Sequence, residues 1–243
     1  MVFAAASMTE TLTEIGDLYM AEHPEVSIVY NFDSSGTLKT QIQEGADCDL
    51  FISAGQKQMN QMDAADTTGT NEEGLDLVVS ETRVDLLENT ITLVVPENNP
   101  KEIASFDDLA AKLQDGSILM AMGNEDVPVG QYTQKILAYY NLSEEDLAAA
   151  GTITYGSNVK EVTTQVAEGS VDCGIIYCTD AFSAGLTVVA SADKEMCGQV
   201  IYPAAVMKNA RNPEVAADFL SYLFNDNCGS IFANVGFTPI AAE

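Results

Sequence analysis

Basic side chains and histidine are scarce in this chain of 243 residues. Ten Lys and Arg stand against 37 Asp and Glu, giving a formal net charge of −27. A field of this sign repels nucleic acid and anionic membrane surfaces, so nucleic-acid binding is not expected. The single histidine, His23, precedes Pro24 at an expected helix end. A multi-histidine metal site, a Ser-His-Asp triad and a histidine acid–base pair are therefore excluded or badly weakened.

Long apolar runs and paired cysteine motifs are also absent from the sequence. No apolar run approaches the roughly 20 residues that a membrane helix needs. No charged-then-apolar leader precedes the first strand-like residues, VFAAAS, so we expect a mature or trimmed form from which a leader has been removed. The five cysteines form no C-x-x-C motif, and an odd number cannot all pair within one chain, so no disulfide framework is expected.

Strand-like and helix-like segments alternate along the chain, and a hydrophobic content of 47% is enough for a real core. Strands are expected at VFAAAS, VSIVYNF, CDLFISA, ITLVVP, SILMAMG, GTITYG, DCGIIY, LTVVA and QVIYPAAVM. Helices are expected at about 7–23, 36–44, 106–113 behind the cap candidate Ser105, 129–140, 158–168, 213–224 and 228–235. This alternation predicts an α/β fold with mostly parallel sheets covered on both faces.

The spacing of the helix entrances suggests two lobes of similar architecture. Ser7 and Ser35 lie 28 residues apart in the first third of the chain, and Gly130 and Val159 lie 29 apart in the middle. The two halves show no sequence repeat. The similarity is therefore one of architecture only.

Four strand-to-helix turns consist of small or hydroxyl residues, and they are the main functional signal in the chain. They are AAAS at 4–7, DSSG at 33–36, VPVG at 127–130 and GSNV at 156–159. Each places backbone N–H groups, and often a hydroxyl, at the positive end of a helix, where an anion is stabilised. Such turns gather at the carboxyl ends of strands, where α/β proteins bind ligands. The alternative is that each serine is only a helix cap, and Ser7 with Glu10 fits a capping box.

At these four turns the sequence resembles that of the molybdate-binding proteins of ABC transporters, which belong to the type 2 periplasmic-binding-protein superfamily. The matching stretches include VFAAAS, SSGTLKTQIQEGADCDLFISAGQKQM, NEDVPVGQYTQKIL, VKEVTTQVAEGSVDCGIIYCTDA and IFANVGF, which cover nearly the whole chain in family order. The resemblance implies a two-lobed fold of mixed, mostly parallel sheets flanked by helices, with a ligand cleft between the lobes. Residues 1–82 and 198–243 would form one discontinuous lobe, and 83–197 the other.

The resemblance also implies five ligand-binding residues. The hydroxyls of Ser7 and Ser35, the backbone N–H groups of Val129 and Val159, and the hydroxyl of Tyr177 would hold the oxyanion. For Tyr177 the alternative is a half-buried strand tyrosine whose hydroxyl is bonded elsewhere.

Three positions depart from the family pattern. The family often has alanine where Val129 stands and serine where Gly36 stands, and its usual tryptophan near QKQM is missing here. A backbone N–H survives the first change. The other two changes concern packing or the rim of the pocket.

Uncharged donors suit a tetrahedral dianion, which has only acceptors. Each charge-assisted hydrogen bond contributes roughly 1.5–3 kcal/mol, so no Arg or Lys is required at these positions. A carboxylate in the site would accept the proton of hydrogen phosphate. Because none of these five positions carries a carboxylate, the site favours fully ionised oxyanions over hydrogen phosphate. Selection of molybdate or tungstate over the smaller sulfate would depend on cavity size. No cofactor and no metal bound directly by side chains is expected, since the metal would enter as an oxyanion.

We therefore expect an extracytoplasmic receptor that captures molybdate or tungstate and delivers it to the permease of an ABC transporter. It would be a monomer and not an enzyme, in the periplasm or on the outer face of the membrane as a lipoprotein. One alternative is a binding protein for another ionised oxyanion such as sulfate. Another is the ligand-sensing domain of a regulator, although no basic helix-turn-helix segment is present. A third is a hydrolase with Ser35 or Ser7 as nucleophile, which lacks a histidine base.

Overall fold

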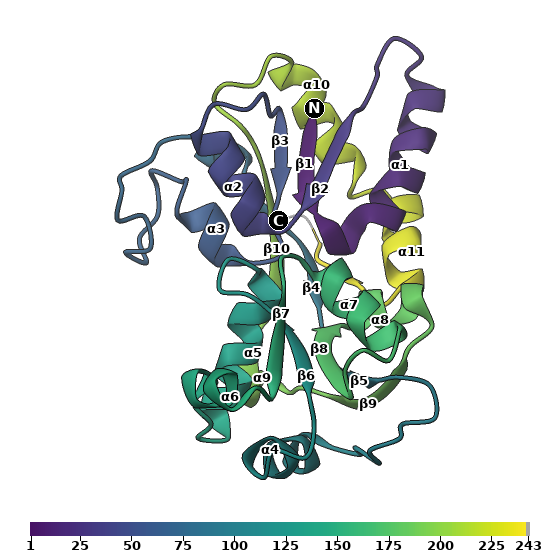
Figure 1. Cartoon of the computed structure of the whole chain (residues 1–243). Coiled ribbons are helices and arrows are strands. Elements are labelled where there is room, and N and C mark those ends of the chain that lie inside the picture. The colour runs from purple at the N-terminus through teal and green to yellow at the C-terminus, as the bar shows by residue number, and fades with distance from the viewer. Residues whose placement is uncertain (242–243) are drawn as a thin grey trace. The chain divides into compact units, whose positions relative to one another are not determined.

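Strands and helices alternate along most of the chain in the computed structural model, which describes residues 1–241. The chain divides into two units. Unit 1 contains Met1–Glu88 and the described residues from Ile201 onward, and unit 2 contains Asn89–Val200. Unit 2 is thus one continuous segment inserted between the two parts of unit 1 (Figure 1).

The sheet of unit 1 has six strands in the order β11-β4-β10-β3-β1-β2. Their bounds are β1 Val2–Ala5, β2 Tyr30–Asp33, β3 Leu50–Ile52, β4 Val84–Asn89, β10 Val200–Val206 and β11 Thr238–Pro239. β1 pairs in parallel with both β2 and β3, whereas β10 is antiparallel to β3 and β11 to β4. The sheet is therefore mixed, with its parallel part at β3-β1-β2.

The helices of unit 1 follow from this order of strands. They are η1 Ala6–Met8, α1 Thr9–Glu22, α2 Ser35–Gln43, α3 Gln56–Asn60, η2 Ser80–Thr82, α10 Pro213–Tyr222 and α11 Asp226–Asn234. The chain steps from β1 to β2 in one direction and from β2 across to β3 in the other, so right-handed crossovers place α1 and α2 on opposite faces (Figure 1). Under α2 the core contains Phe3, Leu38, Phe51 and Met59, each less than 5% exposed.

Unit 2 repeats this arrangement with a sheet of five strands in the order β7-β6-β8-β5-β9. The strands are β5 Ile91–Val95, β6 Met120–Gly123, β7 Ile153–Gly156, β8 Cys173–Tyr177 and β9 Thr187–Ser191. β6 is parallel to β7 and β8, and β5 is antiparallel to β8 and β9. The helices are α4 Phe106–Gln114, α5 Pro128–Tyr139, α6 Glu144–Ala150, α7 Val159–Ala167, α8 Cys178–Ala184 and α9 Lys194–Cys197. α5 and α7 lie on opposite faces of the parallel strands, as α1 and α2 do in unit 1 (Figure 1).

The α/β class predicted from the alternation is confirmed, with more antiparallel pairing than the alternation indicates. The strands are shorter than the apolar runs, and residues 26–29 of the run VSIVYNF lie outside β2. The sequence did not predict β4, β11 or the short helices α3, α8 and α9.

Two further features concern the whole described chain. All five cysteines are free thiols. Across residues 1–241, no helix combines the length and the apolar character needed to cross a membrane.

Candidate functional site

Ser7 and Ser35 lie at the same edge of the unit 1 sheet. β1 ends at Ala5 and leads into η1, which contains Ser7, while β2 ends at Asp33 and leads into α2, which begins at Ser35. Ala5 lies opposite Asp33 in a parallel pair, so both strands end at one level of the sheet. The fold therefore brings two hydroxyl-bearing turns, 28 residues apart in sequence, to the carboxyl ends of neighbouring parallel strands.

Ser7 does not cap α1, contrary to the alternative in which this serine is only a helix cap. A 3-10 turn intervenes after β1, so α1 begins at Thr9 behind Met8 and receives no side-chain cap. The side chain of Ser7 is instead buried, and its Oγ lies 2.9 Å from the hydroxyl oxygen of Tyr202. The Ser7 hydroxyl therefore contacts a side chain of β10 and does not cap the start of α1.

Ser34, and not Ser35, caps α2. The Oγ of Ser34 accepts the backbone N–H of Thr37 at 3.1 Å. Ser35 is completely buried, and its Oγ accepts the backbone N–H of Ala54 at 2.9 Å. Because Ser35 accepts this bond, its own hydroxyl proton can be donated to another acceptor.

In unit 2 the two predicted backbone donors lie in the first turns of α5 and α7. Val129 is the second residue of α5 and Val159 the first of α7, and both side chains are buried. The first four N–H groups of a helix have no acceptor inside the helix, and the positive end of the helix dipole lies there. Asn158 caps α7, because its Oδ1 accepts the backbone N–H of Glu161 at 3.1 Å. This cap uses the N–H of Glu161 and not that of Val159.

Glycine closes the turn that carries Val129. A Cβ atom on Gly130 would lie 2.3 Å from the carbonyl oxygen of Asn124 and 2.4 Å from that of Gly123, so a larger residue would force the backbone apart. The N–H of Asn124 in turn donates to the carbonyl of Gly156 at 3.0 Å, at the end of β7. The turns after β6 and β7 are therefore fixed to each other.

Tyr177 is the last residue of β8 and, at 1% exposed, is a fully buried strand tyrosine. Three residues later, the side chain of Asp180 is fully buried, and Lys160 Nζ lies 3.5 Å from its Oδ1. Lys160 follows Val159 directly in the first turn of α7. This ion pair joins the first turn of α7 to the first turn of α8, beside two predicted ligand residues.

The structure thus gathers the predicted residues in two sets, one in each unit. Ser7 and Ser35 lie where β1 and β2 of unit 1 end. In unit 2, Val129 and Val159 follow β6 and β7, and Tyr177 is the last residue of the neighbouring parallel strand β8.

Sequence reasoning missed the partners that orient the two serines, Tyr202 and the N–H of Ala54. A lone tyrosine in the buried strand VIYPAAV was a usable signal, because a buried phenol needs a hydrogen-bond partner. The hydrogen bond from the Ala54 amide could not be predicted, because every residue except proline has a backbone N–H.

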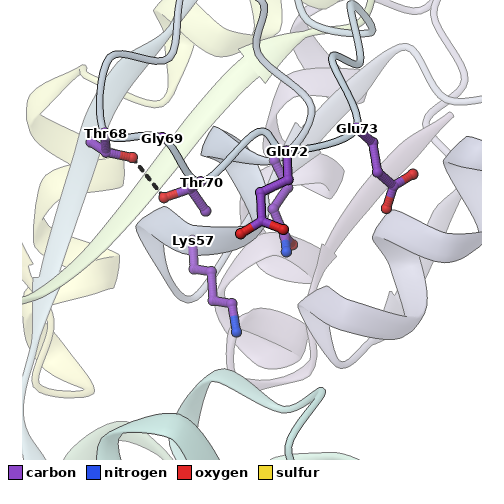
Figure 2. Close-up of a pocket in the computed structure, with 7 residues that line it drawn as sticks. Lys57, Thr68, Gly69, Thr70, Glu72 and Glu73 are labelled. Carbon is purple, nitrogen blue, oxygen red and sulfur yellow. Dashed lines mark hydrogen bonds between the residues drawn. The ribbon is translucent and has the colours of Figure 1, made fainter.

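A separate hollow of about 480 Å³ in unit 1 contains none of these residues (Figure 2). It is lined by Lys57, Gln61, Thr68, Gly69, Thr70, Glu72 and Glu73. Figure 2 shows the hydroxyls of Thr68 and Thr70 bonded to each other, at 2.6 Å. Two carboxylates against one ammonium make this lining unfavourable for a dianion, so we do not assign the oxyanion to it.

Comparison with known proteins places the chain among solute-binding proteins. A family model described as bacterial extracellular solute-binding protein matches residues 1–238. The molybdate-binding protein ModA of Escherichia coli (strain K12) is 34% identical over 244 residues, covering 98% of this chain and 88% of the relative. The ModA protein of Haemophilus influenzae is 32% identical over 241 residues, covering 98% of this chain and 89% of the relative.

Solved structures give the same picture at the level of the fold. A substrate-binding domain ascribed to a molybdenum ABC transporter of Clostridium difficile is 31% identical, with a TM-score of 0.68 and coverage of 100% of this chain and 98% of that one. The periplasmic molybdate-binding protein of Azotobacter vinelandii is 18% identical, with a TM-score of 0.80 and coverage of 100% and 99%. The sulfate-binding protein SubI of Mycobacterium tuberculosis is 17% identical, with a TM-score of 0.77 and coverage of 98% and 86%. The periplasmic-binding-protein fold implied by the resemblance is confirmed.

Proposed function

The chain belongs to the family of bacterial extracellular solute-binding proteins, and we propose that it captures molybdate or tungstate and delivers it to the permease of an ABC transporter. The observation that carries this proposal is the pair of buried serine hydroxyls at one strand edge of unit 1. Near full-length similarity to two ModA proteins supports the choice of ligand.

We propose that Ser7 and Ser35 bind the oxyanion through their hydroxyls, Val129 and Val159 through their backbone N–H groups, and Tyr177 through its phenol. These residues are all less than 6% exposed, so a ligand held by them would be largely removed from water. All five groups are uncharged donors. In such surroundings charge-assisted hydrogen bonds stabilise a dianion without any cation among its direct partners.

The donor set favours a fully ionised oxyanion but does not by itself rank molybdate, tungstate and sulfate. Size distinguishes them, because molybdate and tungstate are larger than sulfate. We place molybdate and tungstate first because two relatives above 30% identity, the ModA proteins, are named for molybdate binding. The likeness to the sulfate-binding protein concerns the fold alone.

The proposed role is that of a carrier and not of an enzyme. A carrier releases its ligand unchanged and needs no general base, and a buried serine without a histidine partner is a poor nucleophile. We propose a monomer that works in the periplasm, or on the outer face of the membrane as a lipoprotein. The partners would be the oxyanion and the transporter, and not nucleic acid.

Calorimetric titration with molybdate, tungstate, sulfate and phosphate tests the proposal. We expect tight one-to-one binding of molybdate and tungstate, weaker binding of sulfate and no measurable binding of phosphate. A ligand at about one hundred times its Kd stabilises the fold by roughly 2.7 kcal/mol, so thermal unfolding should shift upward with the same ranking. Equal binding of sulfate and molybdate would contradict the selectivity, and no binding of any oxyanion would contradict the receptor function.

A further inference from the structure

The hydroxyl of Tyr202 lies directly beside the proposed ligand residue Ser7. Tyr202 belongs to the central strand β10 of unit 1 and is completely buried. Its hydroxyl oxygen lies 2.9 Å from Ser7 Oγ, although the two residues are 195 positions apart in sequence. Phe237 packs edge-on against the ring of Tyr202, with centroids 5.2 Å apart, which holds the ring in place.

A hydrogen bond between two hydroxyls can run in either direction, and its direction decides what Ser7 can do. A phenol, with an ordinary pKa near 10, is a better donor than an alkyl alcohol, and the alcohol is the better acceptor. The favoured direction is therefore from Tyr202 to Ser7. In that state Ser7 keeps its own proton for a second acceptor, and the first bond strengthens the second.

The other serine of unit 1 provides a parallel case in which the direction is certain. The backbone N–H of Ala54 can only donate, and it donates to Ser35 Oγ at 2.9 Å. With the favoured direction at Ser7, both serine hydroxyls would receive a hydrogen bond from a buried group of the same unit, one from a phenol and one from an amide. Each hydroxyl proton would then be available for a second acceptor.

We propose that Tyr202 is a positioning residue that makes Ser7 a hydrogen-bond donor to the oxyanion. This inference rests on the proposed function, since it assigns Tyr202 a role at the same site. Without the phenol, the Ser7 hydroxyl can rotate and is no longer held with its proton directed away from Tyr202. The molecule would then lose affinity for a ligand that has only acceptors.

A double-mutant cycle in the full chain tests this role. We expect Tyr202→Phe to weaken molybdate binding by about fivefold to thirtyfold, the range for a misdirected buried hydrogen bond. If Tyr202 acts through Ser7, the same substitution in a Ser7→Ala background should weaken binding by less than about twofold. A purely structural role would weaken binding by the same factor in both backgrounds.

Tyr19→Phe is the matched control. Tyr19 is also a buried tyrosine of unit 1, and its hydroxyl donates to Asp218 Oδ2 at 2.6 Å. We expect this variant to keep the molybdate affinity of the original protein even though it loses a buried hydroxyl. Thermal unfolding of every variant establishes that it is folded at the titration temperature. If Tyr202→Phe alone is unstable, the Ser7→Ala/Tyr202→Phe variant should recover part of the stability, since both partners of the bond are then removed.

The outcomes separate this inference from the proposed function. If the original protein binds molybdate but the two Tyr202→Phe steps are equal, or neither weakens binding, the inference is overturned and the receptor function stands. If the original protein binds none of molybdate, tungstate and sulfate, both are overturned. A weakening that disappears in the Ser7→Ala background, with Tyr19→Phe unaffected, supports both.

Discussion

Lys160 Nζ lies 3.5 Å from Oδ1 of Asp180, whose side chain is fully buried while that of Lys160 is 32% exposed. Removing one partner of a buried ion pair leaves a buried charge without its main counter-charge, which costs more than the pair contributes. Because Lys160 is partly exposed, we expect Lys160→Met to lower the free energy of unfolding by about 1–3 kcal/mol. Urea denaturation measures this effect.

An exposed ion pair supplies the control for that measurement. Lys208 pairs with Asp76 at the surface of unit 1, and Lys208→Met should change the free energy of unfolding by less than about 1 kcal/mol. In addition, Lys160→Met with Asp180→Leu should cost less than the sum of the two single changes. Equal effects of Lys160→Met and Lys208→Met would contradict the structural role of the buried pair.

The adjacent serines 34 and 35 should separate stability from binding. Ser35→Ala should weaken molybdate binding by about tenfold to a hundredfold, the value of one charge-assisted hydrogen bond. Ser34→Ala should instead remove the cap of α2 and lower the free energy of unfolding by about 0.5–2 kcal/mol, with little change in affinity. Calorimetry and denaturation on both variants test the contrast, and a larger loss of affinity in Ser34→Ala would contradict the site.

Gly130 should be required for the turn that carries Val129. A methyl group there would meet two carbonyl oxygens at 2.3 and 2.4 Å, so Gly130→Ala should cost about 1–3 kcal/mol of stability and weaken molybdate binding by displacing the N–H of Val129. Gly229→Ala is the control, because in α11 the nearest atom outside the helix's own backbone, Cγ of Pro239, lies 3.9 Å from the added methyl. That variant should be as stable as the original protein or more stable by up to about 1 kcal/mol. Unchanged binding in Gly130→Ala would argue against a role for this turn.

The net charge of −27 should slow the approach of a dianion at low salt. Raising NaCl from 10 to 150 mM shortens the Debye length from about 30 to about 8 Å, so the association rate constant for molybdate should rise several-fold. Stopped-flow tyrosine fluorescence is suitable, since the chain has nine tyrosines and no tryptophan. A rate constant that falls with salt would indicate a basic entrance to the site and contradict this expectation.

The buried carboxylate of Asp63 should make stability depend on pH in the acid range. Burial by itself would raise the pKa of Asp63, but hydrogen bonds from Ser80 at 2.6 Å and Arg83 at 2.9 Å outweigh it and lower the pKa below its usual value. The unfolded chain then binds the proton more readily, with a pKa of about 3.9, so the contribution of Asp63 is present above that value. It is lost as the pH falls through the lower pKa of the folded state.

We therefore expect Asp63→Asn to be destabilising at pH 7 and to differ less from the original protein below about pH 4. Urea denaturation at pH 7, 5, 4 and 3 measures the difference. A difference that stays constant over this range would show that the ionised form of Asp63 is not what stabilises the fold.

Hydrophobic periodicity and cap chemistry predicted much of the fold from the sequence. Ser105 was expected to precede a helix, and its Oγ accepts the N–H of Asp108 at 3.1 Å at the start of α4. Cap chemistry did not predict the exact first residue of α1 and α2, where the helix start differs by one or two residues from the expected one. The 3-10 turn after β1 moves the start of α1 past Ser7, and two neighbouring serines with equal capping propensity do not reveal that Ser34 is the cap.

Long-range pairing accounts for what the sequence could not predict. The segment VDLLEN forms β4 because it lies beside β10, more than a hundred residues later in the chain. The contact between Ser7 and Tyr202 also joins distant segments, so no window of sequence contains both. The backbone donors Val129 and Val159 could be proposed from the resemblance. A backbone N–H is present whatever the side chain, so valine in place of the family's alanine at 129 does not remove it. The assignment of all five ligand residues remains a prediction for the titrations to test.

The insertion of unit 2 into unit 1 has a consequence for the order of folding during synthesis. β10 lies between β4 and β3, so the sheet of unit 1 cannot be completed until the ribosome has made residues 200–206. By then all of unit 2 has been synthesised as one uninterrupted stretch with its own sheet and core. We therefore expect the inserted half to reach its native state first during translation, while the host half stays incomplete until nearly the end of the chain.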